Sequence, residues 1–113
     1  MKKIYRVKKS QEFEKIIKNK RFFADPAIVL YVKKREDEYA RIGITVKKKI
    51  GNAVVRNKVK RQVRMMVQEI YDFDENFDSI ILIKEKYVKN NFQTNKNILE
   101  RLYKKAKQVK IDK

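Results

Sequence analysis

The segment from Lys47 to Arg64, KKKIGNAVVRNKVKRQVR, constrains the fold more than any other part of this sequence. It holds eight lysines or arginines and no acidic residue, and three of its valines follow one another at intervals of four: Val55, Val59 and Val63. Residues three and four apart lie on one face of an α-helix. The pattern therefore predicts a helix from Ala53 to about Tyr71, with Asn52 as its N-cap and a valine face that packs on a sheet.

On the polar side of this helix, the central cations gather on one flank instead of spreading around the helix. At about 100° per residue, its central cations fall on one flank beside the valine face. We call these cations, together with Asn57 among them, the basic flank: Arg56, Asn57, Lys60, Arg61 and Arg64. A helix that only faces water normally alternates Glu with Lys at i,i+4, yet no acidic residue occurs between Tyr39 and Gln68. Like charges at i,i+4 destabilise a helix unless a partner neutralises them, so the pattern favours phosphate binding over a merely solvated face.

The surroundings of the helix agree with an anionic partner. Lys47, Lys48 and Lys49 lead into the helix start, where free backbone N–H groups and the positive end of the helix dipole attract anions. Asn52 and Asn57 can donate and accept hydrogen bonds in the same region. The whole chain has 31 Lys and Arg against 14 Asp and Glu, a formal charge of +17, which indicates RNA, DNA or an anionic membrane surface as partner.

Absent residue types exclude several chemistries. The chain has no histidine and no cysteine, which excludes His-paired nucleophiles, His-based RNA cleavage, disulfides and zinc sites of Cys and His. We therefore expect no catalytic residue and no metal ligand in the protein itself, and no small-molecule substrate. One dense acidic cluster could hold Mg²⁺ in a self-sufficient nuclease, although a solvated loop explains it better: Asp72, Asp74, Glu75 and Asp78.

Membrane association is disfavoured. The longest apolar run, from Ala27 to Val32, is far shorter than a membrane span, and the valine face of the charged helix is expected to pack on the sheet rather than on lipid. The N-terminal residues lack the apolar stretch of a secretory signal. We expect a cytoplasmic protein.

The remaining pattern predicts an α+β fold in a single domain over residues 1–113. Ser10 is a candidate cap for a short helix that carries Phe13, Ile16 and Ile17. Strands are predicted for residues 27–34, 40–47 and 79–84, and a final helix for about 94–109. In the first two strands, alternate residues face the core: Ile28, Leu30 and Val32, then Ile42, Ile44 and Val46. The order αββαβα corresponds to a two-layer α/β sandwich with a small sheet.

The residues of the charged helix also resemble a known family. The run Gly51-Asn52-Ala53-Val54, followed by Arg56-Asn57, Lys60-Arg61 and Arg64, is similar to the signature of the bacterial ribonuclease P protein component. Length, charge and element order agree with that family over nearly the whole chain. The resemblance implies a mixed sheet with a rare left-handed βαβ crossover through the charged helix.

What the resemblance implies about function is specific. The protein would be the accessory subunit of a ribonucleoprotein endoribonuclease that removes the 5′ leader of precursor tRNA, with the catalytic RNA cutting the chain. Mg²⁺ would be held by that RNA and the substrate. The partners would be ribonuclease P RNA and precursor tRNA, and the RNA-contacting signature would be the basic flank.

The resemblance also implies a cleft for the single-stranded leader, lined by Phe13, Ile17 and Tyr31, with Ile17 standing where the family often has an aromatic residue. Tyr31 on the polar side of its strand supports such a cleft, because aromatic side chains stack on bases. Phe13 shares a face with Ile16 and Ile17, which by itself indicates a core position. The alternative function is a general RNA-binding or ribosome-associated basic protein, since phosphate neutralisation alone binds any nucleic acid.

Overall fold

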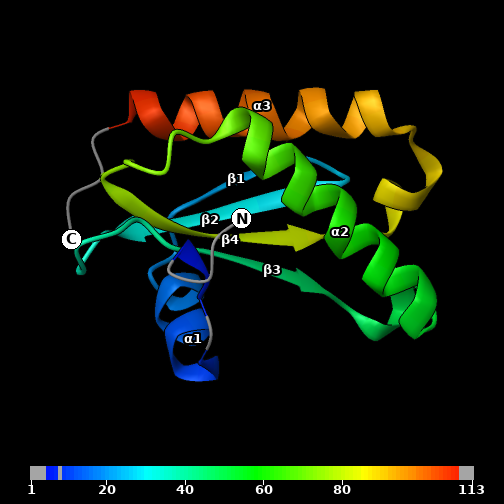
Figure 1. The fold of residues 1–113 in the computed structure, drawn as a ribbon, viewed down its shortest axis with the longest axis horizontal. Coiled ribbons are helices and arrows are strands. Elements are labelled where there is room, and N and C mark those ends of the chain that lie inside the picture. The colour runs from blue at the N-terminus through cyan, green and yellow to red at the C-terminus, as the bar shows by residue number, and fades with distance from the viewer. Residues whose placement is uncertain (1–4, 8, 110–113) are drawn as a thin grey trace.

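The structure, a computed structural model, describes residues 5–7 and 9–109 (Figure 1). Its helices are α1 (Ser10–Lys18), α2 (Ala53–Ile70) and α3 (Phe92–Gln108). Its strands are β1 (Phe22–Ala24), β2 (Ile28–Lys34), β3 (Ile42–Val46) and β4 (Phe77–Ile83), and two short 3₁₀ turns, η2 (Lys48–Ile50) and η3 (Glu85–Lys89), follow β3 and β4. Among these residues no helix is both long and apolar enough to cross a membrane.

The four strands form one mixed sheet in the order β1-β2-β4-β3. β2 pairs antiparallel with β1 and with β4, whereas β3 runs parallel to β4. The chain passes from β3 to β4 through α2, which lies on the viewer's side of these strands in Figure 1, so the crossover is left-handed. The predicted α+β class and the mixed sheet are confirmed.

One face of the sheet carries the main core under α2 and α3. α2 buries one side, formed by Val59, Val63, Met66 and Val67, and α3 buries Leu99, Leu102, Tyr103 and Ala106. These side chains pack on the predicted inward residues of the strands, and Ile28, Leu30 and Val32 are fully buried. Val59 and Val63 therefore orient α2 as predicted, and the basic flank is left outside the core. The prediction was wrong for Val55, which lies in the first turn of α2 and is 36 % exposed.

On the opposite face of the sheet, α1 is the one helix among the described residues, and Val7 packs beside it. Ile16 of α1 is buried against Val7 and Ile80, and Phe13 and Tyr31 pack at the edge of this small cluster. An ion pair between Arg41, just before β3, and Glu12 also ties α1 to the sheet. Since α1 is short, it covers part of this face and leaves an open part, where Tyr31, Thr45 and Leu82 are partly exposed.

Two local predictions were wrong. The strand β1 was not predicted, because three residues are too few to show an alternating pattern; its pairing with β2, Phe22 opposite Tyr31, specifies it instead. Ser10 is the first residue of α1 rather than its cap. The cap position is Lys9, whose backbone N–H donates to Glu12 Oε1 at 3.2 Å. Asn52 is the N-cap of α2 as predicted, and its Oδ1 accepts from the Val55 N–H at 3.0 Å.

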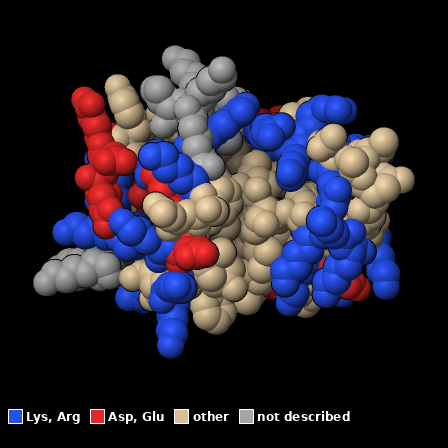
Figure 2. Space-filling view, turned by 90° about the horizontal axis from the view of Figure 1, so that it is seen from below, with Lys and Arg blue, Asp and Glu red and all other residues tan. Residues whose placement is uncertain are grey.

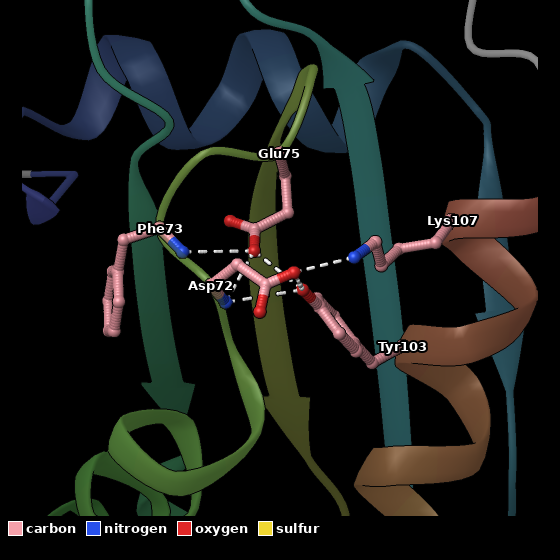
Figure 3. Close-up of polar contacts among 5 residues, drawn as sticks. All are labelled: Asp72, Phe73, Glu75, Tyr103 and Lys107. Atoms are coloured by element: carbon pink, nitrogen blue, oxygen red, sulfur yellow. Dashed lines mark hydrogen bonds and ion pairs between the residues drawn. The ribbon is translucent and has the colours of Figure 1, made fainter.

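The acidic loop between α2 and β4 is fixed to α3 by a polar network (Figure 3). Glu75 is buried, and its Oε2 accepts from the Tyr103 hydroxyl at 2.6 Å and from the backbone N–H groups of Asp72 and Phe73 at 2.8 and 3.0 Å. Lys107 donates to Asp72 Oδ2 at 2.6 Å. These bonds hold the end of α2 in place, so this network stabilises the orientation of the basic flank.

We expect Tyr103→Phe to lower the free energy of unfolding by about 1–3 kcal/mol, because the buried Glu75 carboxylate loses a donor. Tyr87→Phe is the matched control, since its hydroxyl donates to a neutral acceptor, Gln62 Oε1, at 3.0 Å; it is expected to cost about 0.5–1.5 kcal/mol. Urea denaturation of both variants measures the difference. A smaller loss in Tyr103→Phe than in Tyr87→Phe would contradict the importance of the network.

The same network predicts a loss of stability at high pH. Burial, and then the hydrogen bond to Glu75, raise the pKa of Tyr103 well above its usual value. Above about pH 10 a tyrosine in the unfolded chain loses its proton while the folded one keeps it, so stability falls as the pH rises. Tyr103→Phe should flatten this decline in urea denaturation series between neutral and alkaline pH.

Candidate nucleic-acid interface

The basic flank lies on α2 beside the seam that packs on the sheet. Arg56, Lys60 and Arg64 are partly buried at intervals of four residues, and Asn57 and Arg61 are exposed next to them. None of the three arginines nor Lys60 forms an ion pair with a carboxylate of residues 5–7 and 9–109, although nine other such pairs occur there. Their charge is therefore available to an external anion.

A small pocket joins the basic flank to the α1 side of the sheet. It has a volume of about 110 Å³ and is lined by Lys60 and Arg64 of α2, by Phe13 of α1 and by the edge strand β3. Because β3 is the last strand of the sheet, α2 and α1 approach each other around its edge. The structure thus brings two cations of the basic flank, Lys60 and Arg64, next to Phe13, which the sequence analysis assigned to the leader cleft.

Of the three predicted cleft residues, the structure groups two. Phe13 and Tyr31 are half-buried and pack on the same cluster around Ile80. Ile17 is 37 % exposed on α1 and lies outside that cluster. The ring of Phe13 lies directly over Gly43, so the backbone of β3 forms the floor beneath it.

Phe22 is a further aromatic residue of this face that the sequence analysis missed. It is 52 % exposed, and its ring centroid lies 5.6 Å from that of Tyr31 with the planes inclined at 49°. The pair arises from the β1–β2 register, in which Phe22 stands opposite Tyr31. The adjacent phenylalanines after Arg21 were the available signal, but their faces cannot be assigned without knowing the strand pairing.

Charge is distributed unevenly over this side of the molecule. Figure 2 shows an uncharged region in its middle, with Lys and Arg side chains on both sides of it and most of the visible acidic side chains on the left. This side of the molecule therefore offers uncharged surface next to cations. A single-stranded nucleic acid needs both, because its phosphates bind cations and its bases stack on apolar and aromatic groups.

Two of the lysines before α2 line a second pocket. Lys47 and Lys49 line a pocket of about 300 Å³ at the ends of β3 and β4, together with Lys84 and Lys86. Lys49 also forms an ion pair with Glu85, with Nζ and Oε1 3.2 Å apart. At the start of α2, the Val55 N–H already donates to Asn52 Oδ1. Anion binding by Lys47, Lys48 and Lys49 at this helix start stays a prediction.

The acidic cluster considered for Mg²⁺ is divided among separate partners. Asp72 bonds Lys107, Asp74 lies 3.7 Å from Arg35, and Asp78 Oδ1 accepts from the Arg41 N–H at 2.8 Å. Glu75 is held in the buried network. Burial raises the pKa of Asp78, whereas the bond with Lys107 lowers that of Asp72. No group of three or more acidic side chains in the described part of the chain is arranged to hold a metal ion.

The fold and this surface define a small, basic α+β protein that presents an unpaired cationic helix beside an aromatic sheet face. A family model described as Ribonuclease P matches residues 1–107, and the chain belongs to this family. The ribonuclease P protein component of Mesoplasma florum is 40 % identical over 98 residues, which cover 85 % of this chain and 89 % of the relative.

Solved structures agree with the family. The RNase P protein of Staphylococcus aureus superimposes with a TM-score of 0.82 at 34 % identity, over 91 % of this chain and 95 % of that one. The RNase P protein of Thermotoga maritima gives a TM-score of 0.75 at 27 % identity, over 93 % and 97 % of the two chains. Family membership gives the chain the role of a ribonuclease P subunit in tRNA processing, with ribonuclease P RNA as its partner.

Proposed function

We propose that the chain serves ribonuclease P by binding the catalytic RNA through the basic flank and by holding the 5′ leader of precursor tRNA on the open sheet face. The observation that carries the proposal is the meeting of Lys60, Arg64 and Phe13 in one pocket, with both cations free of carboxylates of the described residues. Cations bind the phosphates of a single strand, and aromatic rings stack on its bases.

In this proposal the protein supplies binding and the RNA supplies the chemistry. Mg²⁺, held by the catalytic RNA and the substrate, provides the electrostatic assistance for endonucleolytic cleavage of the phosphodiester. The cations of α2 screen phosphate repulsion between the two RNAs, which lowers the Mg²⁺ concentration that assembly requires. Mature tRNA lacks the leader, so it binds less tightly than the precursor and leaves. We place this activity in the cytoplasm, which the absence of cysteine fits.

Reconstitution with a bacterial ribonuclease P RNA tests the proposal. We expect the chain to increase precursor cleavage at low Mg²⁺ and to raise the affinity for precursor tRNA above that for mature tRNA. Equal affinities for the two tRNAs would reject the leader role. If the chain changes neither cleavage nor RNA binding, the proposal as a whole is rejected.

Simple measurements distinguish two alternative functions from this proposal. A general RNA-binding protein would bind an unrelated structured RNA as tightly as ribonuclease P RNA at moderate salt, because its affinity would come from phosphate neutralisation alone. A self-sufficient nuclease would cleave precursor tRNA with multiple turnovers after complete removal of RNA. The separate partners of the acidic side chains make the second outcome unexpected.

Phe22→Ala is expected to weaken precursor-tRNA binding by the reconstituted particle about 5-fold or more, since base stacking contributes about 1–3 kcal/mol. Mature-tRNA binding should be unchanged. Tyr39→Ala is the matched control, because Tyr39 is 42 % exposed but its ring contacts Tyr5 rather than Tyr31. Equal losses for precursor and mature tRNA would show that Phe22 does not contact the leader.

A further inference from the structure

Polar contacts hold α1 to the sheet at both of its ends. In its first turn, Glu12 forms an ion pair with Arg41, the residue before β3. At its C-terminal end, the side-chain N–H of Asn19 donates to the Val32 carbonyl of β2 at 3.2 Å. We call these two contacts the α1 clamp. Between them, Ile16 is buried against the sheet.

The backbone of Arg41 is itself fixed by the sheet. Its N–H donates to Asp78 Oδ1 at 2.8 Å, and its carbonyl accepts from the Ser79 N–H at 2.9 Å. Its guanidinium group pairs with Glu12 and lies 3.4 Å from the Asp37 carboxylate. The side chains of Arg41 and Glu12 are only 22 % and 24 % exposed, so water and salt weaken their ion pair less than an exposed one.

The clamp determines where the Phe13 ring lies. Phe13 follows Glu12 directly in the chain, and its ring lies over Gly43 in the pocket that the basic flank borders. The apolar contact of Ile16 has no directional preference and leaves a helix of nine residues free to turn about it. Directional contacts at both ends prevent this rotation, so the clamp selects one position of the ring.

The clamp also changes the charge beside the proposed leader cleft. A carboxylate next to Phe13 repels the phosphates of a nucleic acid unless a cation offsets its charge. Arg41 lies against both Glu12 and Asp37 and offsets part of their charge. The ion pair is therefore compatible with an anionic strand in the cleft.

We propose that Arg41 and Glu12 are positioning residues for the leader, which act by fixing the Phe13 ring before the leader binds. This inference rests on the proposed function, since it assigns part of the leader affinity to residues that act through Phe13. A strand that binds a preorganised surface avoids the cost of ordering it, which corresponds to about 2- to 10-fold in affinity for each side chain fixed.

Glu12→Gln in the reconstituted particle tests the inference. Glutamine removes the ion pair but keeps an oxygen that can accept from the Lys9 N–H, as it does in a capping box. The affinity for precursor tRNA should fall about 2- to 10-fold, and that for mature tRNA should not change. The loss of a negative charge would by itself strengthen binding of an anionic leader, so a selective fall reports on positioning.

Glu14→Gln is the matched control. It makes the same change in charge on the same helix, where Glu14 pairs at 3.9 Å with Lys18 and both side chains are exposed. This pair does not reach the sheet, so the precursor affinity should not fall. Urea denaturation checks that each variant is folded at the temperature of the binding assay. Asn19→Ala removes the other contact of the clamp, should also lower the precursor affinity selectively, and serves as the test if Glu12→Gln does not fold.

A double-mutant cycle shows whether the two positioning residues act through each other. Arg41→Gln should lower the precursor affinity more than Glu12→Gln, because it also takes a cation away from Asp37. Addition of Glu12→Gln to Arg41→Gln should then cause no further loss, since the ion pair is already absent.

Four outcomes overturn the inference. In the first, the folded clamp variants keep or raise the wild-type ratio of precursor to mature affinity. In the second, Glu14→Gln shows the same loss as Glu12→Gln. In the third, the losses in the double-mutant cycle are additive. In the fourth, precursor and mature tRNA lose affinity equally, which would assign the ion pair to the general fold. Failure of the proposed function looks different, because the wild type itself would then bind the two tRNAs equally.

Discussion

Lys60→Gln/Arg64→Gln is expected to weaken binding of the chain to ribonuclease P RNA by about 100-fold at moderate salt. The two side chains are partly buried, line the same pocket from one side of α2 and have no carboxylate partner among the described residues. Each charge-assisted contact to phosphate contributes about 1.5–3 kcal/mol, and a tenfold change in affinity corresponds to about 1.4 kcal/mol. Glutamine keeps polarity and most of the side-chain length, so the loss reports on charge.

The measurement is a series of binding titrations at increasing salt. Besides the loss in affinity, the slope of log K against log salt should become shallower by about one per phosphate contact removed. Lys104→Gln/Lys105→Gln is the control, because it makes the same change in net charge at exposed positions of α3, away from α2. Equal losses in the two double variants would mean that only the overall charge of the chain matters, and the assignment of the basic flank would be wrong.

The orientation of the basic flank could be predicted from sequence because it depends on one helix. A period of 3.6 residues relates the valine seam to the cations, and both lie within a single uninterrupted segment. The strand faces of Ile28, Leu30 and Val32 were predictable for the same reason, since alternation is also a local signal. Asn52 could be identified because N-caps follow from residue type and position.

The features that depend on pairing between distant segments could not be predicted. The contact of Phe22 with Tyr31 requires the register between β1 and β2, and the pocket lined by Lys47, Lys49, Lys84 and Lys86 requires β3 and β4 to end side by side. Neither Lys84 nor Lys86 belongs to a recognisable motif. Their positions become meaningful only when the parallel pairing brings the segment after β4 next to Lys47.

The position of α1 over the sheet depends on Gly43, which the alternating pattern assigned simply to the outward face of β3. Gly43 is buried, and a Cβ atom there would lie 2.6 Å from Ile80 Cδ1 and 2.7 Å from two ring atoms of Phe13. Contacts below 3.0 Å force the neighbours to move. The missing side chain therefore lets the Phe13 ring lie on the backbone of β3 and sets the spacing of the proposed leader cleft.

We expect Gly43→Ala to destabilise the fold by about 1–3 kcal/mol, as overpacking of a core does, and to displace α1 from the sheet. Leader affinity of the reconstituted particle should fall with it, because Phe13 moves away from Tyr31. Urea denaturation and precursor-tRNA binding measure the two effects. Binding to ribonuclease P RNA through α2 should change less, since α2 packs on the other face of the sheet.

Substitutions that remove the atoms in contact with the new Cβ of Gly43→Ala test this prediction more directly. Phe13→Leu removes the aromatic ring, and Ile80→Val removes Cδ1, so each should cost less in the Gly43→Ala background than in the wild type. Double-mutant cycles should give a favourable coupling of about 0.5–3 kcal/mol for both pairs. Strictly additive effects would show that α1 does not rest on Gly43. Gly43→Ala/Phe13→Leu can also separate the two roles of Phe13, packing on Gly43 and stacking on a base. Leucine fills the space but cannot stack as an aromatic ring does, so this double variant would then recover stability without recovering leader binding.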